Sequence, residues 1–216
     1  MKKHPAKRNR RRRLKAKTEN QREYIRTMVE SDVIICVGPA GSGKTSVSVG
    51  LACEYLMDKK TEKIVVTRPI IESGKGIGYL PGSFEEKVHP YLVPVLEEMA
   101  LYLGRDGLKK LRDQGLIEIC PLEYMRGRNF HNSFMILDEA QNATREQIKM
   151  FLTRIGWKSK AVINGDPDQC DLPPSTRGSL ELCADNLEDV RGVGVVDLDY
   201  SDIVRNDIIA RILEKI

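Results

Sequence analysis

The sequence predicts an α/β fold in which a mostly parallel central sheet is covered by helices on both faces. Six short runs rich in β-branched residues alternate with stretches of helical spacing, and a glycine-rich loop follows the first run. Strands this apolar are buried on both faces, which is typical of a parallel sheet between two helical layers. The alternation therefore predicts a doubly wound architecture.

The predicted strands share an apolar, β-branched composition and a length of four to six residues. They are Val33 to Val37, Ile64 to Thr67, Ile117 to Cys120, Phe134 to Leu137, Ala161 to Gly165 and Val193 to Leu198. Strands of this kind, separated by helical patterns, are joined by crossover helices in a parallel sheet.

Helical spacing occurs in Lys44 to Met57 and in Thr144 to Ile155, and Thr144 with Gln147 forms a capping-box pattern at the start of the second. Ser201 is expected to cap a final helix that runs towards Ile216. The stretch from Pro69 to Gly115 interrupts the alternation. Its glycines and prolines predict a flexible loop before a helix around Glu85 to Leu103.

A chain of 216 residues can bury one good core, and the sequence shows no repeat and no second domain. We expect a basic arm over residues 1–17 and a folded domain over residues 18–216. The arm holds ten Lys or Arg and no acid, whereas the whole chain carries only +4, which leaves −6 on the remainder. Such a block repels itself and is expected to be disordered. It suits binding to a polyanion such as nucleic acid, with a solvated tail or a processing segment as alternatives.

Cysteine usage and hydropathy point to a reducing compartment. The five cysteines are odd in number and form no CxxC pair; they are Cys36, Cys53, Cys120, Cys170 and Cys183. Free thiols fit a protein kept reduced. No apolar run approaches the roughly 18 residues that a membrane span needs, and no apolar region of a secretory signal follows the basic block. We therefore expect a cytoplasmic protein that does not bind membranes.

A motif of the form GxxxxGK[ST] lies between the first predicted strand and the first helical pattern. Its residues are Gly38, Pro39, Ala40, Gly41, Ser42, Gly43, Lys44 and Thr45. In such a P-loop the glycines let backbone N–H groups surround phosphates, and the following helix adds its partial positive charge. Lys44 is expected to reach the β and γ phosphates and Thr45 to ligate Mg²⁺. A glycine-rich turn that matches by accident is the alternative.

Two acids, Asp138 and Glu139, end an apolar strand. A carboxylate at the end of a buried strand is costly unless it is paired. Asp138 is expected to hold Mg²⁺ in the Walker B role, and Glu139 to act as the general base on the attacking water. The alternative is a pair of solvent-facing acids that begin a loop.

A further predicted strand ends in Asp166-Pro167-Asp168-Gln169. The carboxyl ends of parallel strands form the ligand crevice, so Asp166 and Gln169 are expected to face the same site and to sense the γ-phosphate. A plain Asp-Pro turn is the rival explanation.

Together these motifs resemble the PhoH-like family of ATPases, which are themselves similar to the first motor domain of superfamily 1 helicases. The resemblance covers the chain from about Thr18 to its C-terminus. It rests on the P-loop and on Thr67-Arg68-Pro69, Gly78-Tyr79-Leu80-Pro81-Gly82, Tyr124-Met125-Arg126-Gly127-Arg128, Leu137-Asp138-Glu139-Ala140-Gln141-Asn142 and Gly165-Asp166. It implies a single RecA-like P-loop NTPase domain that uses ATP and Mg²⁺.

The resemblance also implies roles for residues outside the P-loop. Gln21 falls where such motors carry a glutamine that reads adenine, and an amide can pair with the adenine edge; an ordinary helix start is the alternative. Arg68 matches a motif that contacts the nucleic-acid strand in related helicases. Arg126 and Arg128 are candidates for contact with nucleic acid or phosphate. Surface salt bridges are the alternative for these three arginines.

Arg205 matches the family's candidate arginine finger, which would act on the γ-phosphate of a neighbouring subunit. This implies a homo-oligomer, with a hexameric ring as one form. Asn206-Asp207 stands where the family usually has His-Pro, so a structural salt bridge of Arg205 is the alternative.

Three functions remain open at this point. The first is an ATPase coupled to nucleic acid, with single-stranded RNA favoured and unwinding as an extension. The second is an RNA-bound protein that ATP merely switches. The third is a phosphotransferase resembling thymidine kinase, which joins a P-loop to an Asp-Glu-Ala-Gln segment but holds a zinc site of cysteine pairs that this sequence lacks.

Overall fold

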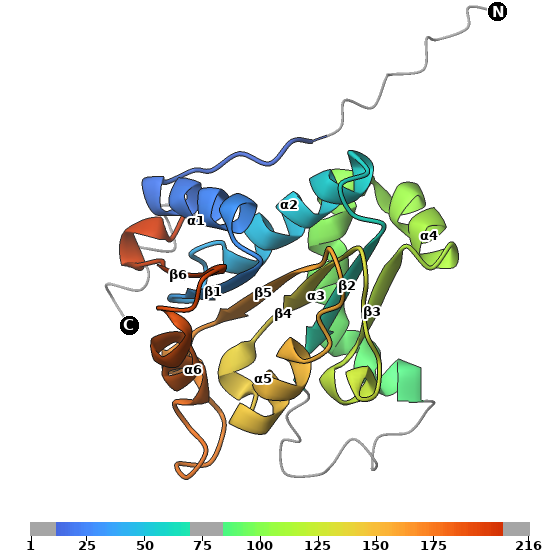
Figure 1. Cartoon of the computed structure of the whole chain (residues 1–216). Coiled ribbons are helices and arrows are strands. Elements are labelled where there is room, and N and C mark those ends of the chain that lie inside the picture. Colours follow the sequence, from blue (N-terminus) through green and yellow to red (C-terminus); the bar gives the residue numbers. More distant parts are fainter. Residues whose placement is uncertain (1–11, 70–83, 205–216) are drawn as a thin grey trace, which may run out of the picture.

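Six parallel strands form one sheet in the order β3-β2-β4-β5-β1-β6 (Figure 1), which confirms the predicted α/β fold class. The computed structural model describes residues 12–69 and 84–204. Each predicted strand is present, most of them longer or shorter by one residue at an end. The strands are β1 (Val33–Val37), β2 (Lys63–Arg68), β3 (Ile117–Pro121), β4 (Ser133–Leu137), β5 (Lys160–Gly165) and β6 (Val193–Asp197).

Two helical layers cover the two faces of the sheet (Figure 1). One face packs against α1 (Glu19–Glu30), α2 (Lys44–Met57), α3 (Phe84–Leu103) and α4 (Arg105–Asp113). The other packs against α5 (Arg145–Leu152) and α6 (Ser179–Leu187). Apolar residues on both faces of the strands are therefore buried, as the sequence composition predicts.

Strand β1 shows how one run of sequence supplies two cores. Ile34 and Cys36 belong to the core beneath α1 and α2, whereas Ile35 belongs to the core beneath α5 and α6. All three side chains are fully buried. Successive side chains of a strand point to opposite faces, so a short continuous apolar run is what a two-sided sheet requires.

The helix ends follow local capping chemistry. Thr18 caps α1, because its side chain accepts the N–H of Gln21, and Thr144 forms the predicted capping box with Gln147 at the start of α5. Helix α5 ends at Leu152, three residues earlier than expected, with Thr153 as its C-cap. Sequence patterns locate helix ends less well than helix centres because fraying ends depend on tertiary contacts.

The expected cap at Ser201 is wrong. Asp199 caps a short 3₁₀ helix, η5 (Tyr200–Asp202), and accepts the N–H of Ser201, which lies inside that turn. The aspartate two residues upstream offers a stronger acceptor than the serine hydroxyl, which explains the shift. The rest of the final helix predicted towards Ile216 lies outside the described residues.

Other expectations also fall outside the described residues: the first eleven residues of the basic arm, the loop with Gly78 to Gly82, and Arg205 with Asn206-Asp207. Two helices, α4 and α6, were not expected from the sequence. Helix α4 has only nine residues, contains Gly107 and buries only Leu108, so it offers few apolar residues from which a helix could be recognised. Helix α6 begins directly after Gly178 with a short nine-residue span.

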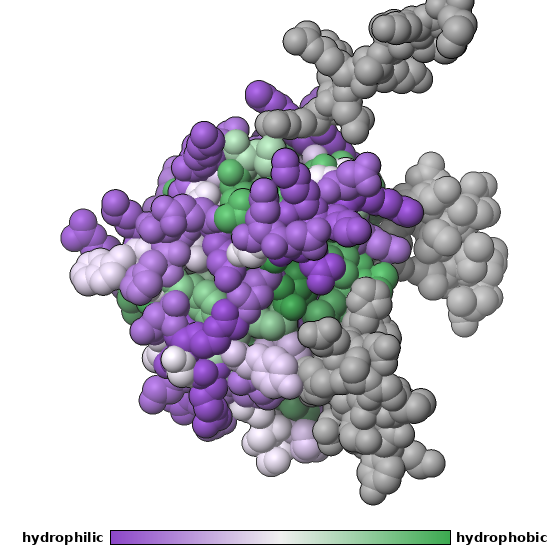
Figure 2. All heavy atoms as spheres, turned by 90° about the vertical axis from the view of Figure 1, so that its right-hand side faces the viewer, coloured by the Kyte–Doolittle hydropathy of each residue, from purple (hydrophilic) through white to green (hydrophobic). Residues whose placement is uncertain are grey.

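The side of the molecule that carries α4 is mainly hydrophilic, with apolar surface between the charged side chains (Figure 2). A groove of about 870 Å³ lies there between α3, α4 and the edge strand β3. Within residues 12–69 and 84–204, no helix is both long enough and apolar enough to cross a membrane.

Candidate active site

The register of the sheet brings the ends of four neighbouring strands together. Val37 of β1 pairs with Gly165 of β5, and Leu137 of β4 pairs with both Ile163 of β5 and Thr67 of β2. The residues that follow these pairs therefore meet at one edge of the sheet. Sequence alone predicts that strand ends converge, but the order of the strands decides which ends are neighbours.

The P-loop connects β1 to α2, and two of its glycines are required by shape. Gly38 and Gly43 have φ angles of +154° and +95°. A Cβ atom on Gly38 would lie 2.5 Å from the carbonyl oxygen of Leu198, and one on Gly43 would lie 2.8 Å from Nε2 of Gln21. Any larger residue would therefore push the loop away from its neighbours. The tight, backbone-lined turn is the kind of cradle that phosphate groups occupy.

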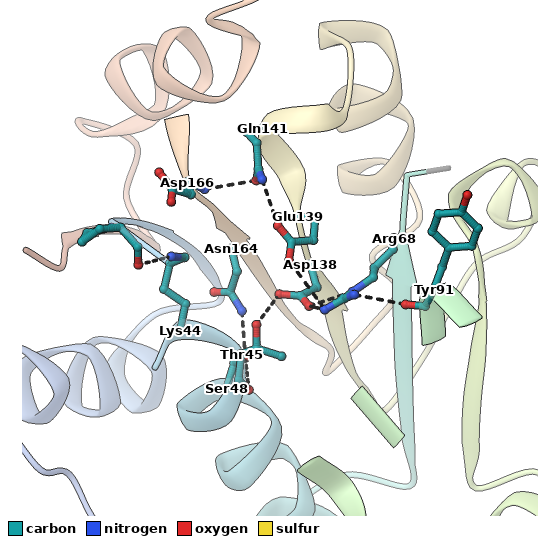
Figure 3. A network of polar contacts seen from close by, with 11 residues as sticks. Lys44, Thr45, Ser48, Arg68, Tyr91, Asp138, Glu139, Gln141, Asn164 and Asp166 are labelled. Atoms are coloured by element: carbon teal, nitrogen blue, oxygen red, sulfur yellow. Dashed lines mark hydrogen bonds and ion pairs between the residues drawn. The ribbon is translucent and has the colours of Figure 1, made fainter. Parts of the chain in front are cut away.

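Lys44 extends over this loop (Figure 3). Its Nζ donates to the carbonyl oxygens of Gly38 at 2.6 Å and of Pro39 at 2.9 Å. The charged group is thus held at the mouth of the P-loop by two neutral acceptors rather than by a carboxylate. Such an ammonium can transfer its hydrogen bonds to phosphate oxygens, which are stronger acceptors.

Asp138 is the buried acid at the centre of the site, with 2% of its side chain exposed. Its Oδ1 accepts the hydroxyl of Thr45 at 2.7 Å, and its Oδ2 accepts Nε of Arg68 at 2.9 Å (Figure 3). The hydroxyl and the carboxylate are the hard oxygen ligands that Mg²⁺ prefers. Their contact across β4 and α2 makes Thr45 and Asp138 a fitting pair of donors for that ion.

Glu139 lies next to this pair in a left-handed backbone conformation, with φ of 57°. Its side chain is 45% exposed, and its Oε2 accepts Nε2 of Gln141 at 2.8 Å. Oε1 of Gln141 accepts the backbone N–H of Asp166 at 3.0 Å. Non-glycine residues with positive φ cost energy and gather at functional sites. Here the turn directs an accessible carboxylate towards the cavity while Gln141 steadies it.

These residues line one cavity of about 320 Å³. Its walls come from the P-loop, from α3 and from the ends of β2, β4 and β5: Ala40, Gly41, Gly43, Lys44, Thr45, Ser46, Arg68, Pro94, Glu98, Asp138, Glu139, Asn164, Gly165, Asp166 and Gln169. Asp166 also caps the 3₁₀ helix η4 (Pro167–Gln169) by accepting the N–H of Asp168. Asp166 therefore forms the Asp-Pro turn and also lines the cavity. That Asp166 and Gln169 sense the γ-phosphate stays a prediction.

Gln21 lies behind the P-loop and is 4% exposed. Its Nε2 donates to the carbonyl oxygen of Ser42 at 2.8 Å, and its Oε1 accepts the backbone N–H of Lys17 at 2.9 Å. Thr18 caps the helix that carries it, so the helix start given as the alternative is present. In this structure the amide joins α1 to the P-loop, and its reading of adenine stays a prediction.

The three arginines proposed for nucleic-acid contact do not form one surface. Arg68 is 13% exposed and belongs to the cavity, where it pairs with Asp138 and donates to the carbonyl oxygen of Tyr91 at 3.0 Å. Arg128 binds both carboxylate oxygens of Glu118 and lies 4.6 Å from the centre of the Phe130 ring. Arg126 is exposed.

The Arg128–Glu118 pair has an electrostatic signature. Hydrogen bonds from Arg128 lower the pKa of Glu118 to about 2. Lys63 lowers this pKa as well, whereas partial burial of the carboxylate raises it. Glu118 aligns with Val65 in the sheet, three residues before Arg68. Arg128 therefore has the structural salt bridge that the sequence left as its alternative.

A buried polar chain behind the P-loop was not expected from the sequence. The Tyr24 hydroxyl donates to Oδ1 of Asn164 at 2.6 Å, and Nδ2 of Asn164 donates to Oγ of Ser48 at 2.8 Å. All three side chains are fully buried, and burial raises the pKa of Tyr24. The only available signal was a polar Asn inside the apolar run Ala161 to Gly165. Gln141 lies in the motif Leu137 to Asn142, but the motif alone assigns it no role.

Three of the cysteines, Cys36, Cys53 and Cys120, are buried, whereas Sγ of Cys170 donates to the carbonyl oxygen of Gln141 at 3.0 Å. Burial raises the pKa of Cys53 and of Cys120 to about 12, and it also raises the pKa of Cys36. Over the part of the chain that the structure describes, no group of three or more His, Cys, Asp or Glu side chains could hold a metal ion. A thiol with a raised pKa is a poor nucleophile and metal ligand.

Comparison with known proteins agrees with the geometry. A family model described as "PhoH-like protein" matches residues 13–216. The chain is 43% identical over 201 residues to a PhoH-like protein of Bacillus subtilis, which covers 93% of this chain and 63% of that protein. It is 40% identical over 200 residues to Protein PhoH of Escherichia coli K12, and this match covers 92% of this chain and 56% of that protein. The chain thus spans about three fifths of the length of the curated relatives it matches.

Among solved structures, the large terminase of a thermophilic bacteriophage, in complex with ADP, superimposes with a TM-score of 0.57 at 13% identity. The match covers 92% of this chain and 50% of the terminase. At this identity the likeness concerns the fold alone.

Proposed function

The chain belongs to the PhoH-like protein family, and from that premise we propose that it hydrolyses ATP with Mg²⁺ and couples hydrolysis to binding of single-stranded nucleic acid, RNA in the first place. The observation that carries the proposal is the contact between Thr45 and Asp138, with Glu139 beside it and Lys44 over the P-loop. This set combines a phosphate cradle, oxygen ligands for a divalent cation and an accessible base.

Each group has a distinct task in hydrolysis. The P-loop amides and Lys44 would hold the phosphates, and Thr45 and Asp138 would hold Mg²⁺, which supplies positive charge to the phosphate oxygens. Glu139 would accept a proton from water as the water oxygen forms its bond to the γ-phosphorus. The bond from that phosphorus to the bridging oxygen breaks, and ADP leaves with the electron pair. Gln141 holds the Glu139 carboxylate in place.

The test is Glu139→Gln. The amide keeps the shape of the side chain but cannot accept the proton, so ATP turnover should fall by about 10²- to 10⁴-fold while Mg-ATP binding remains. Lys44→Ala is the matched variant that should lose binding. If Glu139→Gln hydrolyses ATP at the original rate, Glu139 is not the base. Binding without turnover in the unaltered protein would favour the alternative of a nucleotide-operated switch.

The nucleic-acid part rests on charge. The segment of residues 12–17, here called the basic strap, exposes Arg12, Arg13, Lys15 and Lys17. Within the described ranges none of these four side chains forms an ion pair. Exposed, unpaired cations attract phosphates, and each phosphate contact releases counterions. ATP turnover should therefore rise with single-stranded RNA at low salt and lose this stimulation as salt increases; single-stranded DNA is the comparison. No stimulation by either polymer contradicts the coupling.

A ring of subunits completes the proposal. A head-to-tail contact that closes on itself would bring Arg205 of one subunit to the γ-phosphate of the next, where an arginine finger raises turnover by roughly 10³ to 10⁵. Mass measurement with and without Mg-ATP tests the ring. Arg205→Ala mixed with Lys44→Ala tests the finger, because only a shared site would let two inactive variants form active mixed assemblies.

A further inference from the structure

A further cavity lies at the end of the sheet opposite to the catalytic site. Its volume is about 400 Å³, and it lies at the starts of β4 and β5, whereas the catalytic residues follow the ends of these strands. Lys160, the first residue of β5, lines this cavity, and Gly165, the last residue of β5, lines the catalytic cavity. The five residue steps between them span about 17 Å. The proposed hydrolysis therefore makes no use of this end of the sheet.

Trp157 lines this cavity and is the single tryptophan of the chain, yet 84% of its surface is exposed. Within residues 12–69 and 84–204, none of the other exposed large apolar side chains lines the cavity. A contact with a protein or a membrane needs a contiguous apolar patch, which a lone indole does not provide. The ring instead presents one flat surface to a single planar group.

The turn that carries Trp157 is fastened to the segment before β4. The N–H of Trp157 donates to Nδ1 of His131 at 2.9 Å, and the carbonyl oxygen of Trp157 accepts the N–H of Asn132 at 2.9 Å. The N–H of Gly156 donates to the carbonyl oxygen of Phe130 at 2.8 Å, and a Cβ atom on Gly156 would lie 2.5 Å from that oxygen. An aromatic ring on a fixed backbone loses little freedom when a ligand stacks on it. The exposed indole is therefore preorganised for stacking.

Cations share the cavity with the indole. Three lysines, Lys60, Lys158 and Lys160, are among the lining residues, and Asp32 is the single acid among them. The cavity therefore has a net positive charge at neutral pH. No ion pair joins these lysines to another residue of the described ranges. Their charge is thus available to an anionic ligand.

Lys60 and Lys158 are the two exposed cations of the cavity, whereas Lys160 is partly buried and donates to the backbone carbonyl oxygen of Ser31. Lys158 has a left-handed backbone conformation with a φ angle of 56°, which costs energy in a non-glycine residue and is common at functional sites. The Nζ of Lys60 lies 5.1 Å from the centre of the Tyr55 ring. One lysine comes from the turn after α2 and the other from the turn before β5, so two walls of the cavity offer an exposed ammonium group.

We propose that this cavity is a second contact site for single-stranded nucleic acid, in which a base stacks on Trp157 and backbone phosphates contact Lys60 and Lys158. An aromatic surface beside exposed cations is the combination that binds a single strand with little sequence preference. The inference rests on the proposed binding of single-stranded nucleic acid and adds to it a contact at the end of the sheet away from the catalytic cavity. The basic strap supplies charge alone, whereas the Trp157 site also supplies stacking.

Trp157 reports its own occupancy, because no other tryptophan contributes to the emission. The full chain is titrated with an oligouridylate while tryptophan emission is recorded, and binding is measured separately by the anisotropy of the same oligomer carrying a fluorescent label. Inorganic polyphosphate, which has charges but no bases, is the matched polyanion, and its binding is measured by competition. We expect the oligouridylate to quench the emission along the anisotropy curve, and polyphosphate to bind without quenching.

Point variants separate stacking from charge. Trp157→Ala should weaken oligouridylate binding by about tenfold, the factor that 1.4 kcal/mol represents, and Trp157→Phe should lose less because it keeps an aromatic ring. Lys158→Ala should reduce the slope of log K against log salt by about 0.7, the value for one phosphate contact of a single strand, whereas Trp157→Ala should leave the slope unchanged. Lys110→Ala removes an exposed lysine of α4 and is the control that should change neither quantity. All these side chains are exposed, and thermal unfolding of each variant separates a binding effect from a folding defect.

The outcomes separate this inference from the function on which it rests. If the full chain binds no oligouridylate at low salt, the proposed nucleic-acid binding fails, and the Trp157 site fails with it. If the oligomer binds but leaves the tryptophan emission unchanged, the Trp157 site is overturned and the proposed function stands. Equal quenching by polyphosphate would mean that the cavity only attracts anions, which also overturns the inference. So would an emission that changes with protein concentration alone, because a second copy would then cover the indole.

Discussion

The guanidinium of Arg68 and the carboxylate of Asp138 form an ion pair that is almost closed to solvent, with 13% and 2% of the two side chains exposed. Arg68 ends β2 and Asp138 follows β4, so the pair spans two neighbouring strands at the site edge. The same carboxylate accepts the Thr45 hydroxyl. Arg68 therefore neutralises the acid that we propose as a Mg²⁺ ligand.

Arg68→Ala should destabilise the protein and sharpen its response to Mg²⁺. Removing one partner of a buried pair leaves the other charge uncompensated, at a cost of about 3 kcal/mol in the free energy of unfolding. A divalent cation can then take over part of the compensation. Without nucleotide, MgCl₂ should raise the melting temperature of Arg68→Ala more than that of the unaltered protein.

Arg68→Lys keeps the charge and is the control, with a smaller Mg²⁺ response than the alanine variant. Equal shifts of the melting temperature in all three proteins would show that the loss of Arg68 does not let Mg²⁺ bind to Asp138. The readout is thermal unfolding with MgCl₂ and with EDTA, so it needs no catalytic activity.

Gln141→Ala should slow catalysis without weakening nucleotide binding. The Gln141 amide joins Oε2 of Glu139 to the backbone N–H of Asp166, so its loss frees the proposed base to rotate. A misplaced base costs on the order of 10²-fold in rate. Steady-state kinetics should show a fall in kcat with KM nearly constant. A rise in KM at constant kcat would assign Gln141 to binding instead.

Gln141→Glu is a stricter version of this test. The substituted carboxylate has nearly the same shape but cannot donate to Glu139, and it places a like charge beside it. We expect a loss in kcat at least as large as for alanine. A variant that retains full kcat would show that the hydrogen bond to Glu139 is not needed.

The sequence predicts those parts of this protein that depend on local chemistry. The P-loop is recognisable because its glycines and Lys44 are consecutive, and the Thr144 capping box because its partners are three residues apart. All six strands follow from short apolar runs. Where Arg68 lies could not be predicted in this way, because its partner Asp138 is 70 residues away and becomes a neighbour only through the order of β2 and β4.

The same reason explains the other omissions. Tyr24, Asn164 and Ser48 belong to α1, β5 and α2, and no spacing in the sequence joins them. The sequence leaves Arg128 equally suited to nucleic acid and to a salt bridge, and only the fold shows that β3 places Glu118 beside it. Contacts between distant segments are a property of the fold, so motif spacing cannot reveal them.

Tyr24→Phe tests the buried polar chain behind the P-loop. The substitution removes the hydroxyl that donates to Oδ1 of Asn164 and leaves that buried oxygen without its partner. The free energy of unfolding should fall by about 1 to 2 kcal/mol. Because Tyr24 is not among the residues lining the catalytic cavity, kcat should stay within about twofold, which is a small fraction of a kcal/mol. Urea denaturation and steady-state kinetics measure the two effects.

Asn164→Ala is the companion variant, and here both readouts should change. Asn164 lines the catalytic cavity as well as bonding Tyr24 and Ser48. A double-mutant cycle of Tyr24→Phe with Asn164→Ala should give less than the sum of the single effects, since both remove the same hydrogen bond. Strict additivity would mean that the Tyr24–Asn164 bond contributes nothing to stability.

Glu118→Gln should show a stability defect that disappears in acid. Hydrogen bonds from Arg128 hold the folded pKa of Glu118 at about 2, against an ordinary value of 4.5. A depressed carboxyl pKa contributes stability that is complete above the ordinary value and is lost as pH falls through the folded value. Because the pair is partly exposed and screened, we expect Glu118→Gln to cost about 1 kcal/mol at neutral pH. Urea midpoints should show this difference shrinking between pH 4.5 and pH 2.

Arg128→Ala should follow the same course, whereas Glu62→Gln, an exposed control, should show no defect at any pH. A constant difference from neutral pH down to pH 2 would mean that the Arg128 contact does not set the ionisation of Glu118.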